Sequence, residues 1–284
     1  MNDMTNADMN EYWNGDGGRK WVRFQDRMDA SLIPFGLKAM AAVGVSAGEF
    51  VIDVGCGCGD STLELARRAG PGGHVLGIDI SEPIIARART RAASTGARNV
   101  SFQRGDAQVH KFAPCAADVV FSRFGIMFFD DPAAAFGNIR RGLKPGGRVA
   151  FICWRPIQDN EWISLSLDVV ARHVPLPPPS GPETPGPLSF GDPDRVRRIL
   201  TSAGLSDVAI EGAHTPFKVG GNLDEAVEFL TQMGPASGAI AQSDADEATK
   251  SRIAADMREA LTPYDTGQGA VIGAATWVVT ARNP

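Results

Sequence analysis

Residues 51–60 narrow the possible folds of this chain more than any other stretch. They read VIDVGCGCGD, so a buried apolar run ends in three closely spaced glycines, Gly55, Gly57 and Gly59. Glycine adopts backbone conformations that other residues avoid, and it lets backbone amides come close to a ligand. The N-terminus of the helix expected next favours negative charge at the same place. The stretch therefore predicts a strand, a tight turn and a helix, with a ligand site at the turn.

The alternation of strand and helix patterns continues along the chain. Short apolar runs predict strands at 50–54, 74–79, 100–104, 118–122 and 148–153, and the stretches between them predict helices at 61–69, 82–95 and 132–143. This order is typical of βαβ units around a parallel sheet. Farther along, the patterns are less regular and predict a helix at 192–203, a strand at 208–211, helical structure over 223–262 and a closing strand at 276–282.

These patterns predict one α/β domain with helical insertions. The N-terminal helical segment is rich in aromatics and glycines, and we expect it to cover a ligand site as a lid. Seven prolines in 175–187 predict a stiff loop. The expected parts are 1–45 as the lid segment, 46–156 as the core, 157–187 as a cap segment with the proline-rich loop, 188–222 as a continuation of the core, 223–268 as a helical cap and 269–284 as the last core strand.

Composition and charge exclude several classes of protein. The 284 residues are 43% hydrophobic and 21% charged, as in ordinary globular proteins. The net charge of -5 disfavours a general affinity for nucleic acid, which needs clustered cations. The polar N-terminus and the absence of an apolar run of about 18 residues lead us to expect a cytoplasmic protein without a membrane segment. Four scattered histidines and four cysteines without C-x2-C spacing give no metal site.

The spacing of the glycines separates two kinds of nucleotide ligand. A dinucleotide fingerprint, G-x-G-x-x-G, would need glycine at position 60 or 62, where the chain has Asp60 and Thr62. An acidic residue, Asp53, precedes the glycines, and it would serve a ligand with an ammonium group. The pyrophosphate of a dinucleotide would instead be repelled by Asp53 and Asp60. A nicotinamide oxidoreductase is therefore disfavoured.

Two further acids follow the next two predicted strands. Asp79 ends the second strand, where a carboxylate can accept hydrogen bonds from both hydroxyls of a ribose. Asp106, followed by Ala107, comes after the third strand and can accept from an exocyclic amine such as that of adenine. Each acid alone could instead be a helix cap or a solvated turn residue, and Asp106 alone fits that interpretation better than a ligand contact. Together with Asp53 they describe one ligand with an amino-acid, a ribose and an adenine part, which is S-adenosylmethionine.

On these motifs, and on LKPGG at 143–147, the chain resembles the class I S-adenosylmethionine-dependent methyltransferases. The resemblance is close over about 48–154 and is strongest to the small-molecule branch that includes the quinone-biosynthesis enzymes. It implies an α/β, Rossmann-like, doubly wound sheet of seven mostly parallel strands, with an antiparallel final strand and helical cap insertions. It also implies S-adenosylhomocysteine as product and a cofactor site formed by Asp53, Gly55, Cys56, Gly57, Gly59, Asp79, Ile80, Asp106, Ala107, Ser122 and Trp21.

The end of the fourth predicted strand is expected to lie under the transferable methyl group. Residues 122–129 read SRFGIMFF and lack the Asn/Asp-Pro-Pro-Tyr tetrad that orients planar amines in nucleic-acid and glutamine methyltransferases. We therefore expect a small-molecule acceptor, with Arg123, Phe124, Met127 and Tyr12 in its pocket. The apolar side chains could instead be core, and Arg123 either binds an acidic substrate group or pairs with an internal carboxylate. The sequence names no general base.

The expected reaction is in-line displacement of the sulfonium methyl, catalysed mainly by positioning and exclusion of water. Two alternatives keep the same motifs: a non-catalytic module that binds S-adenosylmethionine, and an enzyme of this fold that performs other chemistry such as decarboxylation or cyclisation. The expected partner is the small-molecule acceptor, without nucleic acid or membrane, and a homodimer is allowed.

Overall fold

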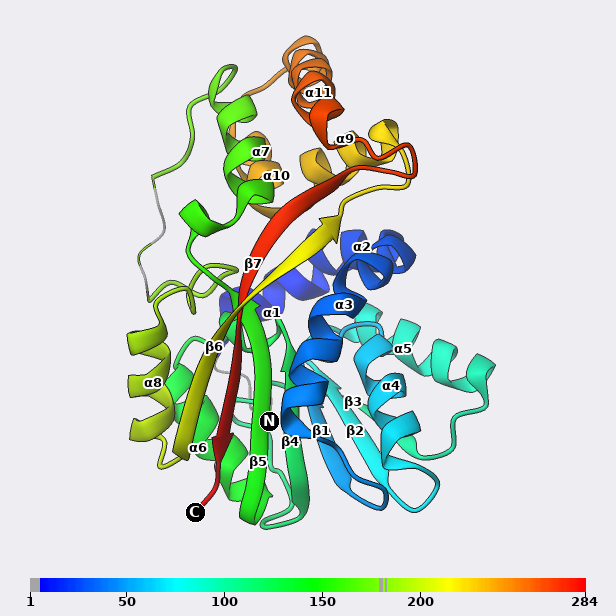
Figure 1. The fold of residues 1–284 in the computed structure, drawn as a ribbon, viewed down its shortest axis with the longest axis vertical. Coiled ribbons are helices and arrows are strands. Elements are labelled where there is room, and N and C mark those ends of the chain that lie inside the picture. The colour runs from blue at the N-terminus through cyan, green and yellow to red at the C-terminus, as the bar shows by residue number, and fades with distance from the viewer. Residues whose placement is uncertain (1–5, 179–180, 182) are drawn as a thin grey trace.

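The computed structural model describes residues 6–178, 181 and 183–284. Over these residues, seven strands form one sheet in the order β3-β2-β1-β4-β5-β7-β6 (Figure 1). The first five strands are parallel, and β7 runs antiparallel between β5 and β6. This confirms the expected fold class. The strands are β1 (Phe50–Val54), β2 (His74–Asp79), β3 (Val100–Arg104), β4 (Ala117–Arg123), β5 (Leu143–Trp154), β6 (Ser206–Lys218) and β7 (Val271–Arg282).

Helices cover both faces of the sheet and its carboxyl edge (Figure 1). One face carries α3 (Gln25–Val43), α4 (Asp60–Ala69) and α5 (Glu82–Thr95), and the other carries α6 (Pro132–Gly142) and α8 (Pro193–Ser202). Two short helices, α1 (Ala7–Asn14) and α2 (Asp16–Arg23), precede α3. The cap above the far ends of β6 and β7 consists of α7 (Glu161–Ala171), α9 (Leu223–Gln232), α10 (Gly234–Gln242) and α11 (Glu247–Leu261).

Local sequence signals explain where several helices begin and end. The Asp131 side chain accepts a hydrogen bond from the Ala134 amide at 2.9 Å, and Pro132 occupies the first helical position of α6. Helix α5 ends at Gly96, which has a left-handed backbone that favours glycine. The bounds predicted for the first three strands and for α5 agree with the structure.

Other predicted bounds were wrong because distant chain segments determine them. Strand β5 begins at Leu143 instead of 148, because Leu143 pairs with Ala117 of β4 and Asn283 bonds to Gly146 and Gly147. Strands β6 and β7 are much longer than predicted because they pair with each other out to Lys218 and Val271. The helical region 223–262 is three helices, broken at Gly234 with φ of 78° and at an extended Ser243.

The predicted lid and the proline-rich loop are described only in part. Residues 1–5 of the lid segment and residues 179, 180 and 182 of the loop lie outside the described residues. In the described part of the chain, no helix combines the length and apolar character needed to cross a bilayer. The same residues contain no group of three histidine, cysteine or acidic side chains arranged to hold a metal ion.

Candidate functional site

The three acids singled out in the sequence lie at one edge of the sheet. Strands β1, β2 and β3 are adjacent and parallel, so their carboxyl ends meet at that edge. Asp53 lies near the end of β1, Asp79 is the last residue of β2, and Asp106 follows β3 by two residues. The crossover topology thus brings together side chains that are 26 or 27 positions apart in the sequence.

The glycine turn between β1 and α4 has a backbone that only glycine adopts easily. The φ angles of Gly55, Gly57 and Gly59 are 65°, 57° and 86°. A Cβ atom at Gly55 would lie 2.6 Å from the Cα of Gly125, and one at Gly57 would lie 3.4 Å from Nε1 of Trp21. The turn is therefore enclosed by the end of β4 on one side and by the N-terminal segment on the other.

Asp53 is fully buried and only half of its carboxylate is satisfied. Its Oδ2 accepts hydrogen bonds from the hydroxyls of Ser61 and Thr62, each at 2.7 Å. Its Oδ1 is buried and has no hydrogen-bond partner among the described residues. Burial raises the pKa of Asp53 to about 6, against the lowering effect of the two hydroxyls.

Asp79 organises the turn through backbone amides. Its Oδ2 accepts from the amide of Gly57 and its Oδ1 from that of Ser81, both at 3.0 Å. Burial raises the pKa of Asp79 to about 6, although these amides favour the charged form. Each oxygen keeps acceptor capacity, because a carboxylate oxygen can accept more than one hydrogen bond.

Asp106 repeats the pattern of a half-satisfied carboxylate. Its Oδ1 accepts from the Gln108 amide at 2.9 Å, whereas its buried Oδ2 has no partner within the described chain. Ala107 is buried beside it, and its carbonyl accepts from the Asn138 amide group at 2.9 Å. The loop after β3 is thereby fixed to α6, with one acidic oxygen left unpaired.

The N-terminal segment is held against the end of β2 by polar contacts. The Asn14 side chain donates to the Ile80 carbonyl at 3.1 Å and accepts from the Glu82 amide at 2.9 Å. The Ser81 hydroxyl donates to the Trp13 carbonyl at 2.6 Å. Tyr12, predicted for the acceptor pocket, is 54% exposed. Sequence reasoning did not select Asn14 as a functional residue, although it directly precedes a glycine between two helices.

Arg123 lies in a buried ionic network. Its guanidinium is 2.8 Å from an oxygen of Asp60 and 3.4 Å from one of Asp29. Arg91 adds an ion pair with Asp29 at 2.9 Å and donates to the Cys58 carbonyl at 2.8 Å. Burial first, and then the charge of Asp60, raises the pKa of Asp29. Of the two alternatives for Arg123, the geometry favours the internal pair over contact with substrate; Asp29 and Arg91 were not predicted from the sequence.

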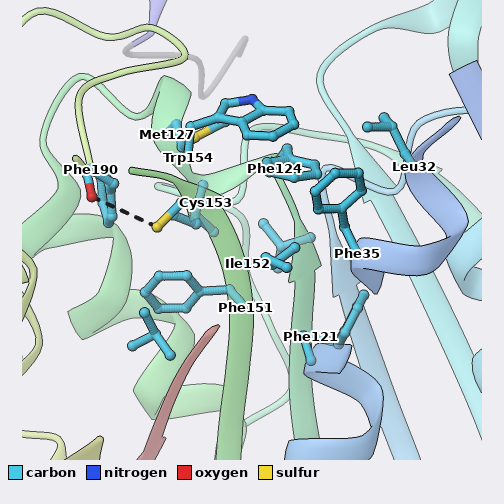
Figure 2. Packing of buried hydrophobic residues seen from close by; sticks show 14 of the residues in the cluster. Leu32, Phe35, Phe121, Phe124, Met127, Phe151, Ile152, Cys153, Trp154 and Phe190 are labelled. Atoms are coloured by element: carbon cyan, nitrogen blue, oxygen red, sulfur yellow. Dashed lines mark hydrogen bonds between the residues drawn. The ribbon is translucent and has the colours of Figure 1, made fainter. Parts of the chain in front are cut away.

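Next to the turn, an aromatic cluster covers the ends of β4 and β5. Phe124 has a φ of 61°, unusual for a residue other than glycine, and its ring stacks on Trp154 with centroids 4.2 Å apart (Figure 2). Phe35 of α3 meets both rings edge-on. This aromatic cluster consists of Phe35, Phe124, Trp154, Trp162, Phe217 and Phe229.

The remaining predicted residues serve as supports in this structure. The Ser122 hydroxyl donates to the Val54 carbonyl at 2.7 Å, which ties β4 to β1. Met127 is buried, and its carbonyl accepts from the Ser189 hydroxyl at 2.7 Å. Cys56 is buried, burial raises the pKa of its thiol, and its amide donates to the Ile78 carbonyl at 3.1 Å.

A cavity of about 550 Å³ opens beside α3, away from the three acids. It is lined on one side by residues of α2 and α3 and on the other by the end of β6 and by α9. Ion pairs cross it, from Arg23 to Glu228 at 3.0 Å and from Arg27 to Glu228 at 3.1 Å. The Ser31 hydroxyl also donates to the Lys218 carbonyl at 2.6 Å. The cavity therefore separates the N-terminal helices from the cap.

Comparison with known proteins agrees with this fold. A family model described as "Methyltransferase domain" matches residues 46–170. The chain is 31% identical over 183 residues to nocamycin O-methyltransferase of Saccharothrix syringae, covering 62% of this chain and 65% of that protein. It is 35% identical over 115 residues to demethylmenaquinone methyltransferase of Lactococcus lactis, covering 40% and 46%. The chain thus spans less than two thirds of the length of either relative.

Solved structures extend the similarity in fold to most of the chain. The YcgJ protein from Bacillus subtilis superposes with a TM-score of 0.56 at 17% identity, covering 87% of this chain and 96% of that one. A methyltransferase-like protein of Bacillus halodurans gives 0.56 at 18% identity, covering 87% and 98%. Residues 46–170 thus match a methyltransferase domain, and the sheet that contains most of them has the fold of these solved structures.

Proposed function

We propose that this protein transfers a methyl group from S-adenosylmethionine to a nucleophilic atom of a small molecule and releases S-adenosylhomocysteine. The observation that carries the proposal is a pair of buried carboxylate oxygens, Asp53 Oδ1 and Asp106 Oδ2, that have no partner in the described part of the chain and lie on either side of Asp79. A buried polar atom without a partner costs about 1–3 kcal/mol. Folded proteins therefore rarely keep one unless a bound group satisfies it.

The donor and acceptor chemistry of these atoms fits the parts of S-adenosylmethionine. Asp53 Oδ1 would accept from its ammonium group, Asp79 from its ribose hydroxyls, and Asp106 Oδ2 from the amino group of its adenine. Backbone at Gly55, Gly57 and Gly59 would allow its amino-acid part to approach closely. The remaining members of the proposed site, which would enclose the ligand or hold its walls in place, are Trp21, Cys56, Ile80, Ala107 and Ser122.

When bound, the cofactor would supply a methyl group on a positively charged sulfur, so that a bond from the acceptor's nucleophile to the methyl carbon replaces the carbon–sulfur bond and the sulfur leaves as the thioether of S-adenosylhomocysteine. The protein then has to align the nucleophile and keep water away, and such positioning can be worth an effective concentration of about 10^5 M or more. Phe124 and Met127 suit this task, because both are buried, lie within two residues of Gly125, which touches the glycine turn, and have apolar side chains. Arg123 would not contact the acceptor itself, because its guanidinium is paired with Asp60 and Asp29; it would support the site by holding together the elements that carry these acids.

A small-molecule acceptor is supported by charge and by the relatives. The chain has 33 acidic and 28 basic residues, which gives no general attraction for a phosphate backbone. The relatives described above are named for methyl transfer to nocamycin and to demethylmenaquinone, which are small molecules. The cap helices α7 and α9–α11 stand above the carboxyl edge of the sheet, where open α/β folds bind ligands.

Calorimetry with S-adenosylhomocysteine tests the cofactor site. Asp79→Ala removes the acceptor for two hydroxyls and the link to the Gly57 amide, and hydrogen bonds to charged groups contribute about 1.5–3 kcal/mol each, so affinity should fall at least about tenfold. Asp130→Ala, at an exposed acid before α6, should leave it unchanged. Failure of the wild-type protein to bind would reject the proposal.

Methyl transfer itself is tested separately. Incubation with S-adenosylmethionine labelled in the methyl group and a bacterial metabolite extract should move label into a small-molecule fraction. Binding without such transfer would favour the non-catalytic alternative, and a product that lacks the labelled methyl would favour other chemistry.

A further inference from the structure

The aromatic cluster contains a hydrogen-bond donor without a partner. Trp162 is 5% exposed, and its indole Nε1 is buried with no acceptor among the described residues. Trp277 shows the ordinary arrangement, because its Nε1 donates to the Gly191 carbonyl at 2.8 Å. A buried N–H donor without an acceptor destabilises the fold, and native proteins rarely keep one unless a bound group satisfies it.

The elements around Trp162 converge on the edge of the sheet where methyl transfer is proposed. Trp162 enters from α7 and packs against Trp154 at the end of β5 and Phe217 near the end of β6, with ring centroids 5.1 Å apart in each case. Trp154 in turn stacks on Phe124 (Figure 2). The residue after Phe124 is Gly125, which touches the glycine turn at Gly55. A continuous series of contacts therefore joins the Trp162 ring to the cofactor turn.

A second unpartnered polar atom lies on the same side of β6. The Thr215 hydroxyl oxygen is buried and has no hydrogen-bond partner within the described residues. Thr215 and Phe217 are two residues apart in a strand, so their side chains share one face. The six rings of the cluster bring no charged group, and the nearby Arg123 is paired with two acids.

We propose that this cluster is the acceptor-binding site and that Trp162 Nε1–H donates a hydrogen bond to an oxygen of the acceptor. The inference rests on the proposed function and deepens it. The chemistry selects a flat, apolar, uncharged molecule with a carbonyl or hydroxyl oxygen, because rings provide its stacking surface and one N–H provides its polar contact. A charged acceptor would lose its hydration here without gaining a counterion.

The cavity beside α3 provides the route to this site. Two residues that line the cavity adjoin buried core residues. Ser31 directly precedes Leu32, and Lys218 directly follows Phe217 of the cluster. The Ser31 hydroxyl, on α3, donates to the Lys218 carbonyl at the end of β6, so both partners of this hydrogen bond line the cavity. Movement of α3 away from β6 would break the bond and open the cavity toward Phe217, the neighbour of Lys218 in the cluster. A volume of about 550 Å³ is in the range of small-molecule sites, roughly 300–1,000 Å³.

The test compares two probes of the same shape on protein saturated with S-adenosylhomocysteine. 2-Acetylnaphthalene carries a carbonyl oxygen, and 2-isopropenylnaphthalene has a CH2 group in place of that oxygen. Calorimetry measures the affinity for each. A site built to donate one hydrogen bond should prefer the ketone by about tenfold in the wild-type protein. Trp162→Phe should reduce that preference to less than about threefold, and Trp277→Phe should keep it. Equal affinities in the wild type, an unchanged preference in Trp162→Phe, or no binding of either probe would overturn the inference.

A second measurement uses the wild-type protein alone. With 15N-labelled indole groups, one of the five tryptophan Nε1–H resonances should lie farther downfield in the complex with the ketone than in the complex with the hydrocarbon. No such difference would overturn the inference without any variant. Binding of S-adenosylhomocysteine is measured first, so a protein that binds it but does not discriminate the probes fails only this inference, and one that does not bind it fails the proposed function.

Discussion

Gly55 and Gly125 touch through their backbones. A Cβ atom on Gly55 would lie 2.6 Å from the Cα of Gly125, and one on Gly125 would lie 2.7 Å from the Cα of Gly55. The first residue belongs to the turn after β1 and the second to the loop after β4, so the proposed cofactor site and the aromatic cluster meet here. Neither residue can carry a side chain unless the two loops move apart.

Gly125→Ala should therefore damage the cofactor site more than the fold. Inserting a methyl group into packed backbone costs about 1–3 kcal/mol, and the glycine turn has to shift to accept it. We expect at least about tenfold weaker binding of S-adenosylhomocysteine by calorimetry. Gly137→Ala in α6, where nothing lies within 4 Å of the added Cβ, is the matched control and should bind normally. Equal affinities in the two variants would refute the role of this contact.

Binding should also depend on pH through the buried acids. Burial raises the pKa of Asp53 and of Asp79 to about 6. Because these folded-state values lie above the usual pKa of about 3.9, the two groups stabilise the unliganded fold at low pH, and this contribution is lost as pH rises from about 4 to 6. The proposed ligand needs both carboxylates charged, so its affinity should rise over the same interval and then level off.

Calorimetry in buffers of different ionisation enthalpy checks this. At about pH 5.5, S-adenosylhomocysteine binding should release protons, and at about pH 7.5 the release should be close to zero. Asp53→Asn should remove part of the release while the Asp79 part remains. An affinity that does not change between these pH values would contradict the assignment of both acids.

Sequence reasoning identified the parts of the site that depend on local pattern. The first three strands are short apolar runs bounded by turn residues, and their ends place Asp53, Asp79 and Asp106 at one edge without knowledge of any other contact. The glycine spacing likewise follows from backbone conformation, as the positive φ angles show. Here local chemistry and the final structure agree.

What the sequence did not reveal depends on contacts between distant segments. Asn14 matters because it meets the chain 66 and 68 positions away, and Asp29 because Arg123, 94 positions away, reaches it. The lengths of β6 and β7 are determined by their mutual pairing at the far end, which includes Pro216, a residue that ordinarily argues against a strand. A single sequence has no pattern that links such pairs.

The contacts of Asn14 predict how the N-terminal segment controls ligand release. Asn14→Ala removes one hydrogen bond to the Ile80 carbonyl and one from the Glu82 amide, which together contribute about 1–3 kcal/mol to holding α1 against β2. We expect S-adenosylhomocysteine to dissociate about 5- to 150-fold faster in stopped-flow displacement, because the segment opens more often. Glu11→Ala, an exposed position on the same helix, should dissociate at the wild-type rate. Identical rates in both variants would show that α1 does not close the site.

Replacing Arg123 should lower the unfolding free energy, by an amount that depends on the charges of Asp29 and Asp60. The Arg123 side chain is 8% exposed, whereas those of Asp29 and Asp60 are 12% and 20% exposed. Removing one partner of a buried ion pair costs about 3–5 kcal/mol, and partial exposure of the acids reduces our expectation for Arg123→Met to about 2–3 kcal/mol in urea unfolding. Arg67→Met, at a side chain that is 72% exposed, should change the unfolding free energy by less than about 0.5 kcal/mol.

Two further results distinguish lost charge pairing from lost packing. Asp60→Asn combined with Arg123→Met should recover part of the stability, because the double variant no longer buries an unpaired acid. The deficit of Arg123→Met should also shrink as pH falls toward 4. Asp29 already has a raised pKa, and loss of the cation raises it further, so the acid becomes neutral in the folded variant at higher pH than in the unfolded chain. The contrary outcome is a loss of unfolding free energy that is the same at about pH 4 and about pH 7 and in the double variant. That result would mean that Arg123 contributes through the packing of its aliphatic stem against Gly36.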